Sequence, residues 1–201
     1  MKKILFDNQM FTLQRFGGVT RYFADLMYNL PKGEFVAEVP MRYCENHYVT
    51  KTYGQEYEKI TFPDNYRFRR QIYMLVNKHI AWKAIRFGNY DIFHPTYFNP
   101  YFLKSVKRSG KPFVLTVHDM TFERYPQDVL IYDRTIPHKK RLIAEADHII
   151  AVSENTKRDI IELLGTDPSK ISVVHHGYRP IAEPAPQLFD RYVLYVGERK
   201  G

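Results

Sequence analysis

Short apolar runs alternate with longer stretches of helical periodicity along most of the chain. The runs are rich in β-branched and aromatic residues, as buried strands are, whereas the longer stretches repeat apolar positions at helical spacing. The predicted strands are Lys3–Phe6, Phe35–Met41, Tyr90–His94, Pro112–His118, His148–Ser153 and Ile171–His175. The predicted helices are Val19–Leu30, Tyr66–Phe87, Arg134–Ala146 and Glu154–Leu164. This alternation predicts an α/β fold, a Rossmann-like parallel sheet with helices on both faces.

A proline-rich stretch follows the last of these elements. Residues 181–190 read IAEPAPQLFD, and such a segment behaves as a semi-rigid linker because proline propagates neither a helix nor a central strand. A buried-strand pattern, RYVLYVG, then occupies 191–197. We therefore expect an N-terminal domain over residues 1–180, a linker over 181–190 and, over 191–201, the first strand of a C-terminal domain whose remainder is missing here.

Composition narrows the classes of protein. The 201 residues are 44% hydrophobic and 26% charged, which is typical of a soluble globular protein with a full core. The net charge is +8, but the basic residues are scattered among acids, so a dedicated nucleic-acid surface is disfavoured and anionic small molecules or lipid surfaces fit better. No signal-peptide core or membrane span is visible, so the cytoplasm is expected. Cys44 is the only cysteine, which excludes an intrachain disulfide and predicts a half-buried structural thiol.

A glycine pair, Gly17-Gly18, lies between the first predicted strand and the first predicted helix. Glycine permits positive φ and close approach of a ligand, and the helix directs unpaired N–H groups at that point. Arg21 adds a positive charge one turn further. The segment predicts a phosphate or pyrophosphate site, although it matches neither G-x-G-x-x-G nor a P-loop. A plain glycine turn without a ligand is the alternative.

Several histidines end or follow predicted strands: His94, His118 and the pair His175-His176. Open parallel sheets bind ligands at this edge, so we expect His118 to contact a ligand and His94, Asp119 and Ser153 to bind substrate. The structural alternatives are turns, with His118-Asp119 as a capped turn, and Ser153 as the cap of the helix that follows it. A metal centre that combines His94, His118, Asp119 and His175 lacks local ligand spacing and is disfavoured.

Six segments resemble the N-terminal half of retaining GT-B glycosyltransferases of family 4 in their order and spacing. They are FGGVTRYFADL (Phe16–Leu26), DIFHPTYF (Asp91–Phe98), FVLTVHDMTFERYP (Phe113–Pro126), ADHIIAVSENTKRDI (Ala146–Ile160), ISVVHHGY (Ile171–Tyr178) and YVLYVGERKG (Tyr192–Gly201). The resemblance implies a two-domain enzyme that moves a sugar from a nucleotide-diphosphate sugar to an acceptor hydroxyl with retention. Such a reaction belongs to polysaccharide biosynthesis.

The resemblance also implies roles for individual residues. Gly17 and Gly18 match the glycine loop that faces the donor phosphates, and Arg21 matches a basic residue in the following helix. His118 matches the histidine that touches the donor sugar, and it is the candidate catalytic residue. Arg199 resembles the start of the basic motif with which the second domain binds the donor phosphates.

Cofactors and partners follow from the same resemblance. Neither a metal nor a cofactor is implied, because backbone amides and arginines can stabilise the leaving diphosphate, and the nucleotide sugar is a co-substrate. The acceptor is a glycan or a lipid-linked glycan, so the enzyme could contact an anionic membrane peripherally, at the inner face. The alternative is a non-catalytic Rossmann-like module that binds an anionic ligand or partner.

Overall fold

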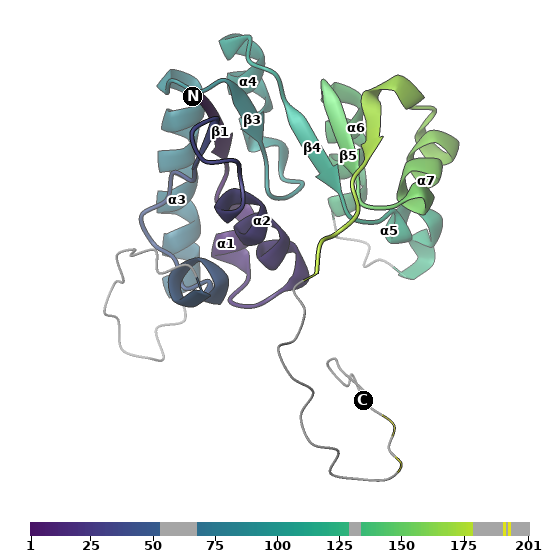
Figure 1. Cartoon of the computed structure of the whole chain (residues 1–201), viewed down its shortest axis with the longest axis horizontal. Helices are drawn as coiled ribbons and strands as arrows, with labels where there is room; N and C mark the ends of the chain where they lie inside the picture. The colour runs from purple at the N-terminus through teal and green to yellow at the C-terminus, as the bar shows by residue number, and fades with distance from the viewer. Residues whose placement is uncertain (53–67, 129–133, 179–190, 192, 194–201) are drawn as a thin grey trace.

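The structure is a computed structural model that describes residues 1–52, 68–128, 134–178, 191 and 193. Within these ranges the strands are β1 (Lys2–Phe6), β2 (Phe35–Glu38), β3 (Ile92–His94), β4 (Val114–Val117), β5 (His148–Ala151) and β6 (Ile171–Val173). Each pair that these strands form is parallel. Their carboxyl ends therefore meet at one edge, at the lower side of the sheet in Figure 1.

The strands form two three-stranded sets, β2-β1-β3 and β4-β5-β6. A parallel bridge between Phe93 and Phe113 joins them, and the Phe93 N–H donates to the Pro112 carbonyl at 2.9 Å. The strand order is therefore β2-β1-β3-β4-β5-β6. The chain leaves β1 on one side for β2 and returns on the other side at β3, so the topological switch point lies between the carboxyl ends of β1 and β3.

Helices flank both sets of strands (Figure 1). The α-helices are α1 (Gln9–Leu13), α2 (Gly18–Tyr28), α3 (Arg69–Phe87), α4 (Leu103–Ser109), α5 (Thr121–Arg124), α6 (Thr135–Glu145) and α7 (Glu154–Leu164). Single turns of other helix types lie at Tyr48–Thr52, Pro100–Phe102, Pro126–Asp128 and Pro168–Lys170. In Figure 1, α3 lies at the outer side of β1 and β3, and α7 lies at the far side of β5 and β6.

A buried asparagine fixes the position of α3. Asn77 is fully buried, and its Oδ1 accepts from the backbone N–H groups of Arg42 and Tyr43 at 2.9 and 3.1 Å. Its Nδ2 donates to Thr12 Oγ1 at 3.0 Å and to the Tyr43 carbonyl at 2.7 Å. Both ends of one amide are therefore satisfied, as a buried polar group requires, and α3 is tied to α1 and to the segment after β2.

The predicted α/β fold with a parallel sheet is confirmed, while several boundaries differ. The strand predicted over Phe35–Met41 ends at Glu38, because Pro40 has no N–H with which to extend a ladder. The short helices α1, α4 and α5 were not predicted. Helix α4 ends at Gly110 in the left-handed conformation, a stop signal that the sequence displays. The linker at 181–190 and almost all of the strand predicted at 191–197 lie outside the described residues.

Two apolar clusters pack against the sheet. The larger surrounds Phe93, which lies 4.8 Å from the Phe102 ring centroid. The smaller contains Phe6, Phe23 and Cys44. Burial raises the pKa of the Cys44 thiol to about 11, so the predicted structural thiol is buried more deeply than expected. In the described part of the chain, no helix combines the length and apolar character needed to cross a membrane.

Candidate functional site

The amino end of α2 faces solvent without a cap. Gly17, its N-cap, offers no side chain to the helix, and the first turn contains no acidic residue. No described residue accepts a hydrogen bond from the N–H groups of Gly18, Val19 or Thr20. These groups and the helix dipole therefore form the kind of end that binds anions.

The glycines act differently from the prediction. Neither Gly17 nor Gly18 has a φ in the left-handed region, and Gly17 is extended at φ 168°, so neither glycine uses the positive φ that its residue type permits. A Cβ on Gly17 would meet the flexible side-chain end of Gln14 at 2.1 Å, whereas a Cβ on Gly18 would meet nothing within 4 Å. Gly18 therefore keeps the space in front of the helix open, without backbone strain.

Of the two arginines predicted to bind phosphate, only Arg21 lies among the described residues. Arg21 is exposed, and its Nε lies 3.6 Å from Asp25 Oδ2, one turn further along α2. An exposed i,i+4 pair of this kind contributes little to stability. Arg199 lies outside the described residues. The phosphate contacts of both arginines stay predictions.

His118 follows β4 and lies in an aromatic enclosure. Its ring stacks on His176 at a centroid distance of 5.6 Å and an interplanar angle of 12°. The Tyr22 ring meets His118 edge-on at 5.0 Å and His176 at 5.2 Å. These three residues form what we call the histidine stack, which joins α2 to the ends of β4 and β6. Since Tyr22 is four residues after Gly18, the stack lies about 6 Å along the helix axis from the uncapped end.

The His118 ring is neutral at pH 7. Burial, helped by the neighbouring His176 and Lys139 and opposed by Asp119, lowers its pKa to about 4. Its Nε2 is buried without a hydrogen-bond partner among the described residues. Buried polar atoms usually have partners. This nitrogen is therefore a site that a ligand hydroxyl could satisfy.

His94 lies deeper than His118. It is 4% exposed, its Nε2 lies 2.9 Å from Thr116 Oγ1, and it packs against the Phe6 and Phe23 rings, both at 5.3 Å. Burial, with a smaller contribution from His118, lowers its pKa to about 3. These contacts are those of a structural histidine, so substrate binding by His94 stays a prediction without support from the geometry.

Asp119 and Ser153 both accept hydrogen bonds from backbone N–H groups at the starts of helices. Asp119 Oδ1 accepts from the Thr121 N–H at 3.0 Å, at the start of α5. Ser153 Oγ accepts from the Thr156 N–H at 3.1 Å, at the start of α7, which confirms the predicted start of that helix. A local turn accounts for the Asp119 side chain and helix capping for the Ser153 side chain, and their substrate-binding roles stay predictions.

A buried ion pair supports the loop after β4. Lys139 Nζ lies 3.0 Å from Glu123 Oε2 and donates to the Asp119 carbonyl at 3.0 Å, and both side chains of the pair are almost fully buried. The Lys139 ammonium also lies 5.1 Å from the centre of the Phe98 ring. Lys139 is therefore internal and does not contribute to a basic surface.

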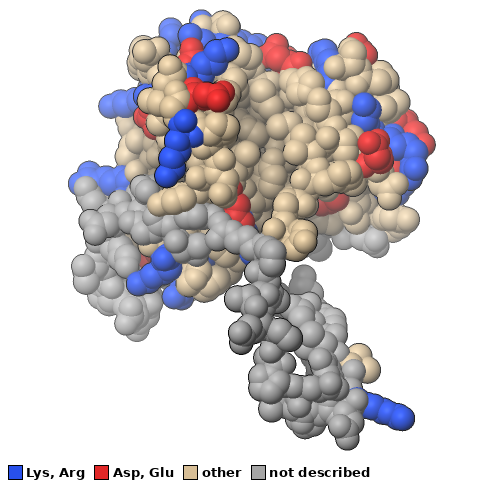
Figure 2. All heavy atoms as spheres, in the orientation of Figure 1, with Lys and Arg blue, Asp and Glu red and all other residues tan. Residues whose placement is uncertain are grey.

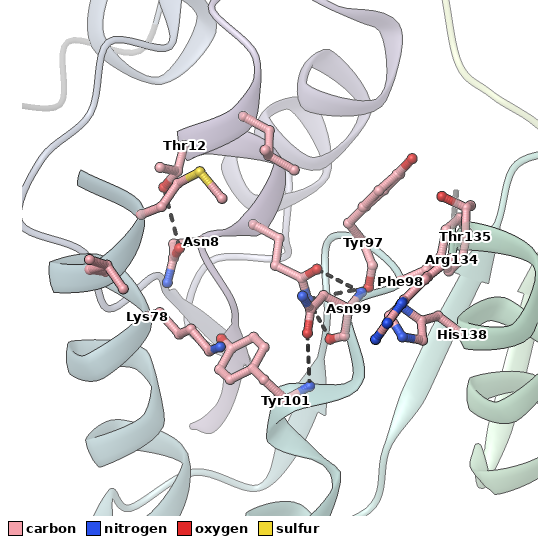
Figure 3. Close-up of a pocket in the computed structure, with 14 residues that line it drawn as sticks. Asn8, Thr12, Lys78, Tyr97, Phe98, Asn99, Tyr101, Arg134, Thr135 and His138 are labelled. Atoms are coloured by element: carbon pink, nitrogen blue, oxygen red, sulfur yellow. Dashed lines mark hydrogen bonds between the residues drawn. The ribbon is translucent and has the colours of Figure 1, made fainter. Parts of the chain in front are cut away.

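A cavity of about 370 Å³ opens beside the switch point. Its walls come from α1, α3, the segment after β3 and the start of α6 (Figure 3). The lining residues are Asn8, Gln9, Thr12, Leu13, Met74, Leu75, Lys78, Tyr97, Phe98, Asn99, Tyr101, Arg134, Thr135 and His138. None of these side chains is acidic, whereas Lys78 and Arg134 are cationic. The size and the mixed apolar and polar lining suit a small organic ligand.

A network of hydrogen bonds holds the wall of this switch-point cavity. Asp7 is fully buried at the end of β1 and accepts from Thr96 N–H at 2.8 Å, Thr96 Oγ1 at 2.7 Å and Gln9 Nε2 at 2.5 Å. Gln9 Oε1 accepts from the Asn99 N–H at 2.8 Å. Burial raises the pKa of Asp7, and these hydrogen bonds act in the opposite direction. The network fixes the segment after β3 to the end of β1.

Several of these residues were not predicted from the sequence. Tyr22 lies four residues after Gly18, on the same side of the helix, and this spacing could have indicated it. Asp7 and Gln9 directly follow the first strand, and Thr96 follows the third, so their positions at strand ends were a usable signal. Among the described residues, no group of three or more His, Cys, Asp or Glu side chains is arranged to hold a metal ion.

The fold and the cavity define a Rossmann-like α/β domain with a candidate ligand site at the carboxyl edge of its sheet. The family model described as Glycosyltransferase Family 4 matches residues 16–180. The chain belongs to this family, as its sequence motifs indicated. No curated protein matches the chain. Membership supports a glycosyltransferase-type function and carbohydrate-related substrates in general.

Proposed function

We propose that this domain forms the acceptor side of a retaining glycosyltransferase that uses a nucleotide-diphosphate sugar. In the reaction, the bond between the anomeric carbon and the diphosphate oxygen breaks, and the diphosphate leaves with the electron pair. The anomeric carbon bonds to the acceptor oxygen, which loses its proton. A second domain holds most of the nucleotide.

The observation that carries this proposal is the position of His118 relative to α2. His118 Nε2 is buried without a partner among the described residues, and the stack that contains His118 lies one helical turn from the uncapped end at Gly18. The diphosphate binds at that end, where N–H groups stabilise the negative charge that grows as it departs. His118 then contacts a hydroxyl of the donor sugar as a neutral hydrogen-bonding group.

The acceptor occupies the switch-point cavity in this proposal. The cavity adjoins the carboxyl ends of β1 and β3, and its aromatic walls suit sugar rings, while Asn8, Asn99 and His138 offer polar contacts. Lys78 and Arg134 favour an acceptor that carries negative charge. A glycan or a lipid-linked glycan with a phosphate group fits this lining, and such an acceptor brings the protein to an anionic membrane.

No metal ion takes part in the proposed reaction. Backbone N–H groups and cationic side chains stabilise the diphosphate instead. EDTA should therefore leave transfer intact in the protein that carries both domains. Loss of transfer that Mn²⁺ or Mg²⁺ restores would overturn this part of the proposal.

The central test is the substitution His118→Ala in the protein that carries both domains. If His118 contacts the reacting sugar, kcat should fall roughly 100-fold or more, which is about what one well-placed transition-state contact contributes. The melting temperature should change little. Steady-state kinetics with nucleotide sugars and thermal unfolding measure the two effects.

His148→Ala is the matched control. His148 is also a strand-end histidine, but it begins β5 at the opposite edge of the sheet, where its Nε2 lies 2.9 Å from Ser172 Oγ. Its loss should leave turnover near normal. Normal turnover in His118→Ala, or a loss of stability alone, would show that His118 is structural and would overturn the proposed role.

A further inference from the structure

Helix α3 carries apolar side chains on the face that points away from the core. Its buried side is the line Tyr73, Asn77, Ala81 and Ile85. On the opposite side, Leu75 and Trp82 lie seven residues apart and are 69% and 38% exposed, and Phe68, the N-cap of α3, lies seven residues before Leu75 and is 59% exposed. Residues seven apart lie almost in line on a helix, so these three side chains form one row, which we call the outer line of α3.

Two further exposed apolar side chains lie on this helix. Met74, next to Leu75 in the sequence, is 42% exposed, and Phe87, at the carboxyl end of the helix, is 72% exposed. The Trp82 ring meets the Phe87 ring edge-on at 6.0 Å and stacks on His79 at 6.0 Å. Scattered exposed apolar residues are ordinary, whereas a continuous row of this length indicates an interaction surface.

The charges on α3 have one sign. Residues 69–87 contain five Lys and Arg residues and no Asp or Glu. Lys78, Lys83 and Arg86 flank the outer line, and the Arg86 guanidinium lies 5.2 Å from the centre of the Phe87 ring. Blue side chains project at this edge of the molecule in Figure 2.

Helix α7, at the other end of the sheet, has the usual mixture. Arg158 Nε lies 3.9 Å from Glu162 Oε1, and Arg124 Nη2 of α5 lies 2.8 Å from Glu162 Oε2. Blue and red side chains alternate along that edge in Figure 2. The single sign of charge on α3 is therefore a local property and does not merely reflect the net charge of +8.

Apolar and aromatic side chains flanked by Lys and Arg are the combination with which a surface helix binds an anionic bilayer. A second copy of the chain would present the same positive charges to this face and would be repelled. Nucleic acid would meet the cations, but it offers no apolar contact for the aliphatic Leu75 and Met74. An anionic lipid surface satisfies both the charges and the row.

We propose that the outer line of α3 docks the protein on an anionic membrane surface. This proposal rests on the proposed function, because it makes the acceptor a molecule presented at that surface. Met74, Leu75 and Lys78 belong both to this face and to the lining of the switch-point cavity. The docked helix therefore places the membrane at the side wall of the cavity, where a lipid-linked acceptor would enter.

The test is flotation of the 201-residue chain with vesicles of phosphatidylcholine, with and without phosphatidylglycerol. The chain should bind the anionic vesicles, and high salt should weaken binding. The triple variant Lys78→Gln, Lys83→Gln, Arg86→Gln should bind roughly 100-fold more weakly, at about fivefold for each charge. The double variant Leu75→Ser, Trp82→Ser should lose roughly tenfold or more.

Matched controls come from the opposite end of the molecule. Lys170→Gln removes an exposed charge near β6, and Tyr125→Ser removes an aromatic side chain that is 52% exposed beside α5. Both should bind vesicles as the unmodified chain does. The α3 variants change side chains outside the buried core, so circular dichroism should show unchanged folding.

Three outcomes would overturn the proposal. They are no binding of the folded chain to anionic vesicles, equal binding by the α3 variants and the controls, and an α3-dependent complex with nucleic acid or with a second copy in place of vesicle binding. The assay needs neither donor nor transfer. Its failure is therefore distinct from failure of the His118 kinetics that test the proposed function.

Discussion

The two polar regions at the carboxyl edge of the sheet differ in how completely their groups are paired. Beside β1, Gln9 Nε2 donates to Asp7 at 2.5 Å, and these two residues form hydrogen bonds of 2.7 to 3.4 Å with Thr96, Tyr97 and Asn99. Beside β4, the His118 ring has aromatic neighbours but no hydrogen-bond partner for Nε2 among the described residues.

This difference distinguishes residues that stabilise the fold from residues that are available to contact a ligand. A fully paired buried network holds its backbone in one arrangement, and it loses stability when one member is removed. A buried nitrogen without a hydrogen-bond partner does not stabilise the fold. Because its hydrogen-bonding capacity is unused, it is available to a ligand. We therefore expect substitutions beside β1 to change mainly the free energy of unfolding, and substitutions in the histidine stack to change mainly turnover.

The largest effect on stability is expected from Asp7→Ala. The change leaves the Thr96 N–H, the Thr96 hydroxyl and the Gln9 amide without their acceptor, so the free energy of unfolding should fall by about 3 kcal/mol. Urea unfolding measures it. Asp167→Ala is the control, because Asp167 is an exposed carboxylate that caps the Ser169 N–H at 2.9 Å, and its loss should cost about 1 kcal/mol or less. Equal losses of unfolding free energy in the two variants would show that the Asp7 network stabilises the fold no more than an exposed capping residue does.

The histidines should make stability depend on pH. In the folded chain, the pKa values of His94 and His118 are lowered from 6.5 to about 3 and about 4. Below pH 6.5, therefore, these histidines bind protons in the unfolded chain but stay neutral in the folded chain. The free energy of unfolding should therefore fall as the pH falls towards 4, by about 1.4 kcal/mol per pH unit for each histidine. Burial raises the pKa of Asp7, which acts in the opposite direction.

Comparison with His94→Gln isolates the contribution of one histidine. An amide can keep a hydrogen bond to Thr116, and it does not titrate. Urea unfolding at several pH values should give this variant a shallower slope than the unmodified chain by about 1.4 kcal/mol per pH unit. Identical slopes would mean that His94 is not held neutral in the interior.

The smallest effect on stability is expected from Gly18→Val. The added side chain meets nothing within 4 Å, and φ is not positive, so the free energy of unfolding should change by less than about 1 kcal/mol. The side chain fills the space before the α2 N–H groups, however, so the affinity for a nucleotide sugar should fall by roughly tenfold in the protein with both domains. Calorimetry and urea unfolding measure the two quantities.

Gly110→Val is the control, because we expect it to change stability and not affinity, the reverse of Gly18→Val. Gly110 has φ +65° at the end of α4, where a β-branched residue is strained by about 1–2 kcal/mol. It should lose stability and leave nucleotide-sugar affinity unchanged. If Gly18→Val binds the nucleotide sugar normally, the α2 end is not the phosphate site.

The sequence predicted the sheet well because each strand carries its own signal. Apolar runs identified β1 and β4, and the Ser153 cap with Gly165 placed both ends of α7. Strand order, by contrast, depends on contacts between distant segments, so neither the switch point nor its cavity could be derived from local patterns. The stacking of His118 on His176 is equally non-local, because it requires β4, β6 and α2 to meet.

The site residues whose predicted roles the geometry leaves without support share one physical feature. Residue type and strand-end position indicated His94, Asp119 and Ser153, but neither shows whether a polar side chain is already paired. In the structure, these three side chains already form hydrogen bonds, His94 with Thr116 and the other two with backbone N–H groups. Likewise, the residue type of Gly17 and Gly18 permits a positive φ without requiring it, and neither glycine adopts one.

The amide of Asn77 determines which way α3 faces. Four hydrogen bonds to Thr12, Arg42 and Tyr43 hold it, and rotating the helix about its axis by even one residue would break all of them. An apolar residue at this position would fill the same space without that directional demand. The buried Asn77, on the opposite side of the helix, thus determines that Leu75 and Trp82 face solvent.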